Sequence, residues 1–284
     1  MKDKRVLIIS SEVVPYLPQT DQAIKSFQIP KTVNENGEYF EHIPIFKGIK
    51  IFNDDGSDAE ANVAVIKSLA THKNLAGKGS LRHSYPHSWR SKAPLIYRAT
   101  PQWFISMESN ALRDKAIKAI NETSFYPPKG RERLLSMIQT RPDWCVSRQR
   151  VWGVPLPIFI NKKTREPLRD KKVIDKIASI YEKQGSDCWF TDDPKVFLGD
   201  SYDPNDYEKL NDIVEVWFDS GSTHSFVLEK RKDLKWPADM YLEGSDQHRG
   251  WFHSSLLESC GTRGKAPFDS ILSHGFVVDG KGMK

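Results

Sequence analysis

The most constraining feature of the sequence is a polar turn between an apolar run and a helical pattern near residue 245. Met240-Tyr241-Leu242 has the composition of a buried strand, and apolar residues recur at helical spacing through residues 251–259. The turn between them reads Glu243-Gly244-Ser245-Asp246-Gln247-His248-Arg249-Gly250. Ligands bind at such strand-to-helix crossovers in open parallel α/β sheets. The pattern therefore predicts an α/β fold with a binding site at this turn.

Helix capping is the simpler interpretation of this turn, with Ser245 or Asp246 capping the following helix and acidic groups complementing its dipole. Capping explains one residue and not the whole set. Positions 247, 250, 251 and 254 fall at i, i+3, i+4 and i+7, so they share one helical face. A buried face rarely carries so many polar groups without a ligand. The spacing therefore favours a binding site.

Two further apolar runs end in polar glycine turns. Residues 213–222 read as a strand that ends at Asp219-Ser220-Gly221, and residues 271–279 read as a strand that contains His274 and Gly275. The second run leads into Gly280-Lys281-Gly282-Met283-Lys284, which suits purine stacking and phosphate contact. We expect these strand ends to form one composite crevice.

Composition excludes several classes of protein. The 284 residues include 8 Trp, 14 Phe and 9 Tyr, which is incompatible with a disordered chain, and the net charge of +5 permits a polyanionic partner without requiring one. Three cysteines at irregular spacing predict free thiols in a reducing cytosol, and no run is apolar enough to span a membrane. We expect a cytoplasmic protein of one large domain or two ordinary ones.

An arginine-rich segment between residues 141 and 153 has two interpretations. Arg141, Arg148 and Arg150, with two tryptophans, could line a polyanion path such as a tRNA contact, or form an ion-pair network inside a joint between domains. Sequence alone leaves both open. Cys145 has no identifiable base, which argues against a cysteine nucleophile, and His83 and His87 lack a third ligand, so no metal site is predicted.

Apolar periodicity and turn residues predict the secondary structure in the rest of the chain. We expect a strand at residues 5–10, short hairpin strands over 32–54 and a turn at Gly77-Lys78-Gly79-Ser80. The charged, turn-rich stretch 161–211 is expected to be a surface insertion. Helices are expected at residues 59–71, 111–122, 131–140 and 172–184.

The turn at residues 243–252 resembles the signature of bacterial-type isoleucyl-tRNA synthetases. Four other segments agree with the same family, in its order, so that the resemblance runs from about residue 28 to the last residue. They are His83 to Arg90, Arg141 to Gly153, Val216 to Gly221 and Ser273 to Phe276.

This resemblance implies a class I aminoacyl-tRNA synthetase that activates isoleucine with Mg-ATP to isoleucyl-adenylate and transfers it to tRNA(Ile). The implied fold is the second half of a Rossmann-like parallel sheet, with a connecting region and the β-rich C-terminal part of the editing insertion. The implied divisions are 1–27 unassigned, 28–105 editing insertion, 106–211 connecting region of the catalytic domain, and 212–284 second half of the catalytic domain.

By match to the motif, the resemblance also implies roles for individual residues. Glu243, Gly244 and Asp246 would hold the adenylate, with an acidic group on the ribose hydroxyls. Gln247 would contact the amino-acid end and Trp251 would wall the side-chain pocket. His274 and Gly275 would border the adenine, and Lys284 would be the first lysine of the Lys-Met-Ser-Lys-Ser loop.

The chain departs from the family in what it lacks. No His-Ile-Gly-His-type motif and no editing signature occur in these residues, and the signature loop stops at Lys284. We therefore expect a fragment that is inactive alone, because the missing groups act on the transition state, and that depends on a complementary synthetase segment. The alternatives are a non-catalytic tRNA- or nucleotide-binding module and the inactive remnant of a truncated gene.

Overall fold

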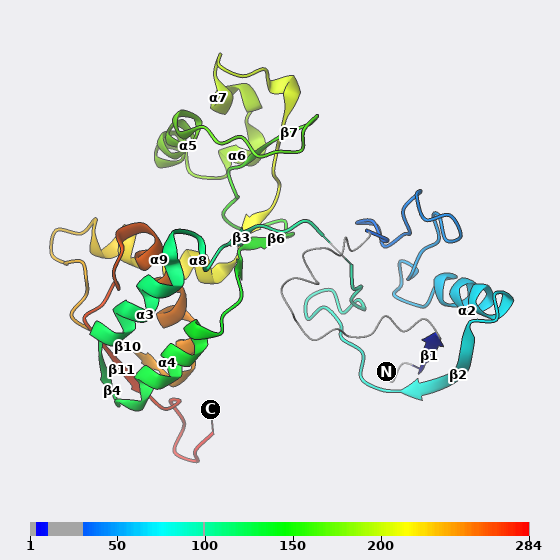
Figure 1. The fold of residues 1–284 in the computed structure, drawn as a ribbon, viewed down its shortest axis with the longest axis horizontal. Coiled ribbons are helices and arrows are strands. Elements are labelled where there is room, and N and C mark those ends of the chain that lie inside the picture. The colour runs from blue at the N-terminus through cyan, green and yellow to red at the C-terminus, as the bar shows by residue number, and fades with distance from the viewer. Residues whose placement is uncertain (1–3, 11–30, 99, 284) are drawn as a thin grey trace. The chain divides into compact units, whose positions relative to one another are not determined.

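The computed structural model describes residues 4–10, 31–98 and 100–283, which divide into two compact units, Met1–Pro101 and Gln102–Lys284 (Figure 1). Most of the segment 1–27, to which no function was assigned, lies outside the described residues, as does Lys284. Each unit is described by itself.

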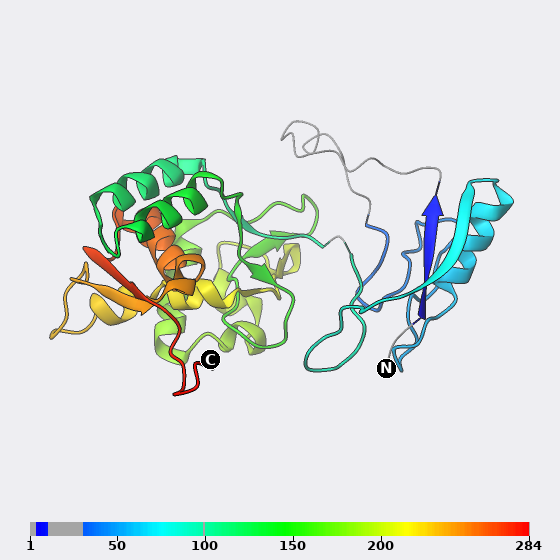
Figure 2. The same ribbon diagram turned by 90° about the horizontal axis from the view of Figure 1, so that it is seen from below.

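The first unit contains a two-stranded antiparallel ladder and one helix. Strand β1 (Lys4–Ser10) pairs with β2 (Leu75–Arg82), and the two lie side by side in Figure 2. This confirms the strand predicted at 5–10, and α2 (Ala61–Thr71) confirms the helix predicted at 59–71. The turn predicted at Gly77–Ser80 was wrong, because these residues are register partners of β1, with Gly79 opposite Leu7. Pairing along a partner strand overrides the local turn preference of glycine.

The hairpins expected over residues 32–54 are only partly present. Isolated antiparallel bridges join Val33 to Tyr39 and Glu38 to Lys50, but none of the described residues from 31 to 60 forms a longer strand. The first turn is closed by the side chain of Asn34, whose Oδ1 accepts hydrogen bonds from the backbone N–H groups of Asn36 and Glu38 at 2.9 and 3.1 Å. Local turn chemistry, not strand pairing, shapes this segment.

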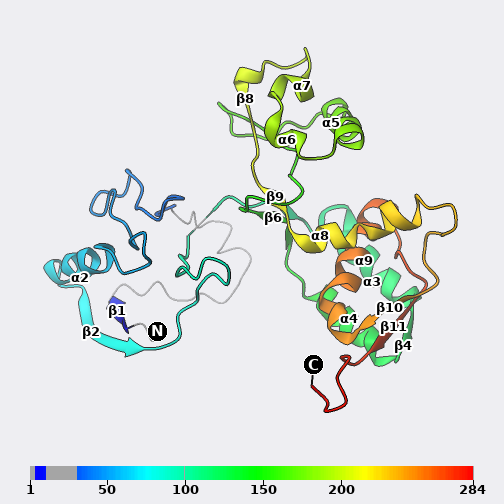
Figure 3. The same cartoon turned by 180° about the vertical axis from the view of Figure 1, so that it is seen from behind.

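The second unit is built on a three-stranded parallel sheet, which confirms the α/β class. Its strands are β4 (Ser124–Tyr126), β10 (Tyr241–Gly244) and β11 (Ser270–His274), in the order β10-β11-β4. Figure 3 shows the same unit from behind. The short strand β4 was not predicted, and it places residues 124–126 in the same sheet as the C-terminal strands.

Three helices share a core with this sheet. They are α3 (Leu112–Glu122), α4 (Lys129–Gln139) and α9 (Trp251–Arg263), and α3 and α4 confirm the helices predicted at 111–122 and 131–140. Ile120, Leu134, Leu256 and Ile271 are fully buried in one cluster. Burial of such side chains contributes about 1.5–3 kcal/mol each, so this cluster holds β10, β11 and α9 in place.

The charged stretch 161–211 has a small core of its own. Trp189 lies 5.0 Å from Phe159 and 5.1 Å from Phe197 between ring centroids, and all three are buried. The helix predicted at 172–184 is confirmed by α5. The elements here are β7 (Phe159–Asn161), α5 (Lys171–Gln184), α6 (Cys188–Thr191), α7 (Pro194–Leu198), η2 (Pro204–Asp206) and β8 (Tyr207–Lys209).

Short elements complete the second unit. Two antiparallel ladders pair β3 (Phe104–Ile105) with β5 (Trp144–Cys145), and β6 (Ser147–Arg148) with β9 (Ile213–Val214). The remaining elements are η1 (Ser109–Ala111), α8 (Val216–Gly221), the π-helical turn η3 (His224–Leu228) and η4 (Ser245–Arg249).

The long strand predicted over residues 213–222 was wrong. Only β9 is extended, and it pairs with β6 outside the parallel sheet. Glu215 then begins helix α8, because its carboxylate accepts a hydrogen bond from the Trp217 N–H at 3.2 Å. The helix cap at Glu215 thus ends the strand after two residues, and the rest of the apolar run is helical.

Candidate functional site

The ends of strands β10 and β11 bring two of the predicted site segments together. The strands are parallel, with Gly244 opposite His274 and Glu243 opposite Ser273. Parallel strands present their carboxyl ends at the same edge of a sheet, which is where open α/β folds bind ligands. Glu243, His274 and Gly275 are exposed at this edge. The two segments therefore form one surface, although about 30 residues separate them in the sequence.

The turn after β10 is held by its glycine and by Asp246. A Cβ atom at position 244 would lie 2.6 Å from Asp246 Oδ1, so any larger residue would push this carboxylate away from the strand end. The Glu243 carboxylate accepts a hydrogen bond from the Gly244 N–H at 3.1 Å. Two carboxylates thus flank Gly244 at the surface.

Gln247, and neither Ser245 nor Asp246, caps helix α9. Its Oε1 accepts a hydrogen bond from the Trp251 N–H at 3.0 Å, while its Nε2 donates to Asp246 Oδ2 at 3.3 Å. The helical face predicted across residues 247–254 is interrupted at Gly250, because η4 ends at Arg249 and α9 begins at Trp251. Gln247 and Trp251 nevertheless remain adjacent through this hydrogen bond.

Trp251 is fixed on two sides. Its ring stacks on Tyr241 of β10, with centroids 4.0 Å apart and planes 3° apart, and its Nε1 donates to the Ser220 carbonyl at 3.1 Å. The second contact joins α9 to the end of α8. The segment 217–221 is therefore part of the site, as expected of a composite crevice, although it reaches the site as a helix.

Trp217 is a site residue that the sequence analysis did not single out. A Cβ at Gly250 would meet the Trp217 ring at 2.9 Å, and it would also collide with Gln247 Oε1. Trp217 therefore packs directly on the glycine that precedes α9. The signal in the sequence was Gly250 at the end of the polar turn, which gains meaning only because the structure packs Trp217 of α8 against it.

His248 anchors the turn to the rest of the unit. Its Nδ1 lies 2.8 Å from the Ser245 carbonyl, and its ring packs edge-on against Phe252 at 5.5 Å. A Cβ at Gly130 of α4 would lie 3.0 Å from His248 Nε2, so this glycine admits the ring. Burial lowers the pKa of His248. The residue is thus a neutral spacer between α4 and the turn.

The three predicted arginines lie in different environments. Arg148 Nη2 is 3.7 Å from the buried Glu215 carboxylate, and its guanidinium also donates to the carbonyls of Cys145 and Ser147. Arg141 lies over the Trp144 ring at 5.5 Å, and burial lowers its pKa. Arg150 is exposed. Arg148 thus forms an ion pair inside the unit, Arg141 contacts an aromatic ring and Arg150 is open to solvent, so both interpretations of the segment remain predictions.

In the part of the chain that the structure describes, no group of three or more His, Cys, Asp or Glu side chains could hold a metal ion. Cys145, Cys188 and Cys260 are free thiols, with Cys188 and Cys260 buried. None of the described helices is both long and apolar enough to cross a membrane.

The whole chain, residues 1–284, matches the family of class I tRNA synthetases (I, L, M and V). The chain therefore belongs to the class I tRNA synthetases, whose parallel α/β sheet the second unit contains.

Within this family the sequence is similar to isoleucine–tRNA ligases. It is 68% identical to that of Pelagibacter ubique over 89% of the chain, and 50% identical to that of Caulobacter vibrioides over 90%. The chain spans about 27% and 28% of the length of these two relatives. A crystal structure of Mycobacterium tuberculosis methionyl-tRNA synthetase bound by methionyl-adenylate aligns with 67% of this chain and 29% of its own, at 16% identity and a TM-score of 0.39.

Proposed function

We propose that this chain contributes the adenylate-binding half of the catalytic domain to a cytoplasmic isoleucine–tRNA ligase. The reaction is activation of isoleucine by ATP to isoleucyl-adenylate, followed by transfer to tRNA(Ile). The observation that carries this proposal is the pairing of Gly244 with His274, which joins two signature segments at the carboxyl edge of a parallel sheet. Similarity to isoleucine–tRNA ligases supports isoleucine as the amino acid.

Each site residue has a role that suits its position. The carboxylates of Glu243 and Asp246 accept hydrogen bonds from ribose hydroxyls, and Gly244 lets the backbone approach the ligand closely. His274 and Gly275, exposed at the next strand end, border the adenine. Lys284, outside the described residues, begins the phosphate-binding loop.

The amino-acid end lies at the start of α9. The Gln247 side chain, held by the Trp251 N–H, faces the amino-acid moiety, and the Trp251 ring, stacked on Tyr241, forms an apolar wall for the aliphatic side chain. Magnesium enters with the phosphates of ATP, since Mg²⁺ binds substrate phosphates and few protein ligands in such sites.

The chain covers about 27% of its relatives, so complementary synthetase segments supply the rest of the active site. Residues 28–105 form the C-terminal part of the editing insertion, and residues 106–211 connect it to the catalytic half. The isolated chain is expected to show negligible aminoacylation, because positioning and charge stabilisation of the reacting phosphates need groups from both halves.

The test is a chimera in which this chain replaces the matching segment of the Pelagibacter ubique isoleucine–tRNA ligase. We expect isoleucine-dependent ATP–pyrophosphate exchange and charging of tRNA(Ile) within about tenfold of the parent enzyme. A folded chimera that exchanges pyrophosphate with neither isoleucine nor valine would overturn the proposal. A chimera active only with valine would overturn the choice of amino acid.

A second candidate is a tRNA-binding module without adenylate chemistry, which the exposure of Arg150 favours. It predicts that the isolated chain binds tRNA with an affinity that falls steeply with salt. Undetectable binding by the folded chain at 50 mM salt would exclude it.

A further inference from the structure

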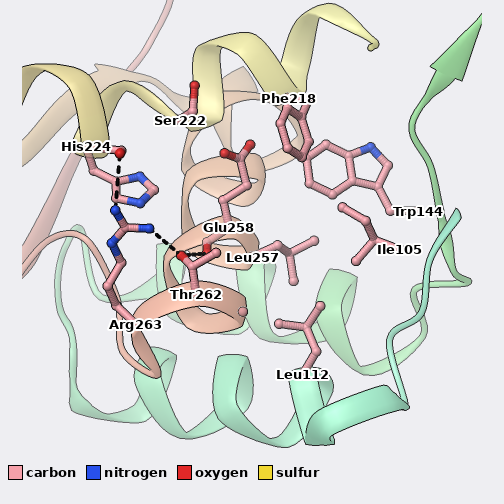
Figure 4. Close-up of a pocket in the computed structure, with 12 residues that line it drawn as sticks. Ile105, Leu112, Trp144, Phe218, Ser222, His224, Leu257, Glu258, Thr262 and Arg263 are labelled. Atoms are coloured by element: carbon pink, nitrogen blue, oxygen red, sulfur yellow. Dashed lines mark hydrogen bonds between the residues drawn. The ribbon is translucent and has the colours of Figure 1, made fainter. Parts of the chain in front are cut away.

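The second unit contains a cavity of about 380 Å³ between helices α3, α8 and α9 and the turn η3 (Figure 4). One wall is apolar and includes Leu112, Trp144, Phe218 and Leu257. A volume of this size lies within the range of roughly 300–1,000 Å³ that is usual for small-molecule sites. The cavity therefore has the dimensions and lining of a ligand site.

His224 lines this cavity and is buried, with 1% of its surface exposed. Its Nδ1 lies 3.0 Å from the Gly221 carbonyl. Because a carbonyl only accepts hydrogen bonds, Nδ1 carries the proton, and Nε2 is left as an acceptor. Nε2 is buried and has no hydrogen-bond partner among the described residues. A buried acceptor without a partner is destabilising, so the site is incomplete as it stands.

Glu258 of α9 also lines the cavity, and its Oε1 is buried without a hydrogen bond from any described residue. The carboxyl group lies against Gly221 of α8, where a Cβ would collide with Oε1. Burial, and next the nearby carboxylates of Asp219 and Glu215, raise the pKa of Glu258 to about 9. At neutral pH the group is therefore a protonated acid.

The charges around Glu258 do not balance. Arg263 approaches from α9, but its guanidinium donates to both oxygens of Glu229 at 2.7 and 2.8 Å. Arg148 pairs with Glu215. In the described part of the chain, no cation forms a salt bridge with either Asp219 or Glu258. Glu258 thus lines the cavity without a salt bridge, and the charge of Arg263 only partly offsets the effect of Asp219 and Glu215 on its pKa.

We propose that this cavity binds a primary amine with an aromatic or branched aliphatic body, its ammonium group between Glu258 and His224. The ammonium donates to the lone pair of His224 Nε2 and to the Glu258 carboxylate, and the body packs on Trp144 and Phe218. When the amine binds, Glu258 releases its proton to solvent and the resulting carboxylate forms an ion pair with the ammonium group. An anionic ligand is disfavoured, because His224 Nε2 presents a lone pair.

The test compares two probes of the same shape on the purified full chain, phenethylamine and 2-phenylethanol, by calorimetric titration at pH 7, 8 and 9. The amine stays mostly protonated in this range, as the lysine ammonium does with its pKa of about 10.4. We expect phenethylamine affinity to rise about tenfold per pH unit until Glu258 ionises on its own, because each binding event releases one proton. The affinity of 2-phenylethanol should not rise with pH.

Two cavity variants and one surface control complete the test. Glu258→Gln keeps the shape of the side chain and should remove the pH dependence, with at least a tenfold loss of phenethylamine affinity at pH 8, whereas Glu122→Gln on the exposed surface of α3 should change neither. Gly261→Leu should fill part of the cavity, because its Cβ makes a 3.7 Å contact with Leu112 and the rest of the side chain extends beyond it. Its free energy of unfolding is measured alongside, so that a loss of binding is separated from a loss of fold. Equal affinity for both probes, or unchanged amine binding in either cavity variant, would overturn the proposal.

Discussion

Gly244 and His274 are register partners on the adjacent parallel strands β10 and β11. This pairing brings a turn rich in carboxylates beside a histidine–glycine strand end at one edge of the sheet. The core formed by α3, α4 and α9 holds both strands, so the geometry of the site depends on residues well outside its signature. The predictions below separate residues that shape the site from residues that stabilise it.

Gly250→Ala should displace Trp217. The new Cβ would lie 2.9 Å from the Trp217 ring and would collide with Gln247 Oε1, which is the cap of α9. We expect the free energy of unfolding of the chain to fall by about 1–3 kcal/mol, as overpacking usually costs. Urea denaturation followed by tryptophan fluorescence measures this loss. Gly79→Ala in β2, where nothing lies within 4 Å, is the control, and equal losses in both variants would contradict this account.

Arg148→Ala should act mainly on stability and Arg150→Ala mainly on RNA binding. Removing Arg148 takes away the cation 3.7 Å from Glu215, whose side chain is only 7% exposed, so we expect a loss of about 1–3 kcal/mol in the free energy of unfolding. Arg150 is exposed, so its removal should leave stability within about 0.5 kcal/mol.

The expected role of Arg150 in RNA binding is checked by measuring how the affinity of the chimera for tRNA depends on salt. Arg150→Ala should reduce the slope of log affinity against log salt by about one charge. The prediction fails if Arg148→Ala leaves stability unchanged, or if Arg150→Ala leaves the slope unchanged.

The stability of the chain should fall as the pH drops below about 6.5. Burial, and next the charge of Arg141, lower the pKa of His253 to about 3, so the unfolded chain binds a proton in this range that the folded chain does not. The contribution of His253 to the free energy of unfolding is fully present above the pKa of the unfolded state. It is lost as the pH falls towards 3, by at most about 1.4 kcal/mol per pH unit.

His253→Leu should remove that part of the pH slope, which urea denaturation at pH 7.5, 6 and 5 measures. The slope that remains is the balance between His224 and His248, whose pKa burial also lowers, and Glu258, whose raised pKa acts in the opposite direction. Val63→Ala, at an exposed position of α2 without a titrating group, is the control and should leave the slope unchanged. Identical slopes for His253→Leu and the unmodified chain would show that His253 is protonated in the folded state.

Glu258→Gln should stabilise the chain at neutral pH. The pKa of Glu258 is raised to about 9 in the folded state and is about 4.3 in the unfolded chain. The stability that the protonated side chain contributes is therefore fully present below about pH 4.3 and is lost as the pH rises towards 9. A neutral amide escapes this cost, and we expect a gain of about 1–3 kcal/mol at pH 7 that vanishes below pH 4. Unfolding of both chains at pH 4 and pH 7 measures the difference, and a loss at pH 7 would contradict the assignment.

The sequence predicted what depends on local periodicity. The helices predicted at residues 111–122, 131–140 and 172–184 formed, and the apolar run before Gly244 became strand β10. The strand predicted over residues 271–279 was too long, because β11 ends at His274. Residues 244–246 and His274 both match motifs of one family, and that resemblance predicted that the two segments share a site. The pairing of Gly244 with His274 in the strand register supports this prediction.

The features that the sequence did not predict depend on contacts across the chain. Strand β4 has three residues, too few for a periodic pattern, and exists because it pairs with β11. The glycines at 77 and 79 lie in a strand because β1 pairs with them. Trp217 joins the site because α8 packs on α9 at Gly250, a contact that no local spacing encodes.

The most direct test of the central claim measures the affinity of the chimera for a stable analogue of isoleucyl-adenylate, the isoleucyl sulfamate of adenosine, with Gly244→Ala and Gly79→Ala as the variant pair. A Cβ at position 244 would lie 2.6 Å from Asp246 Oδ1, so we expect Gly244→Ala to weaken binding at least tenfold while Gly79→Ala has no effect. Equal affinities for the chimera and both variants would show that the adenylate does not bind at the strand ends of β10 and β11.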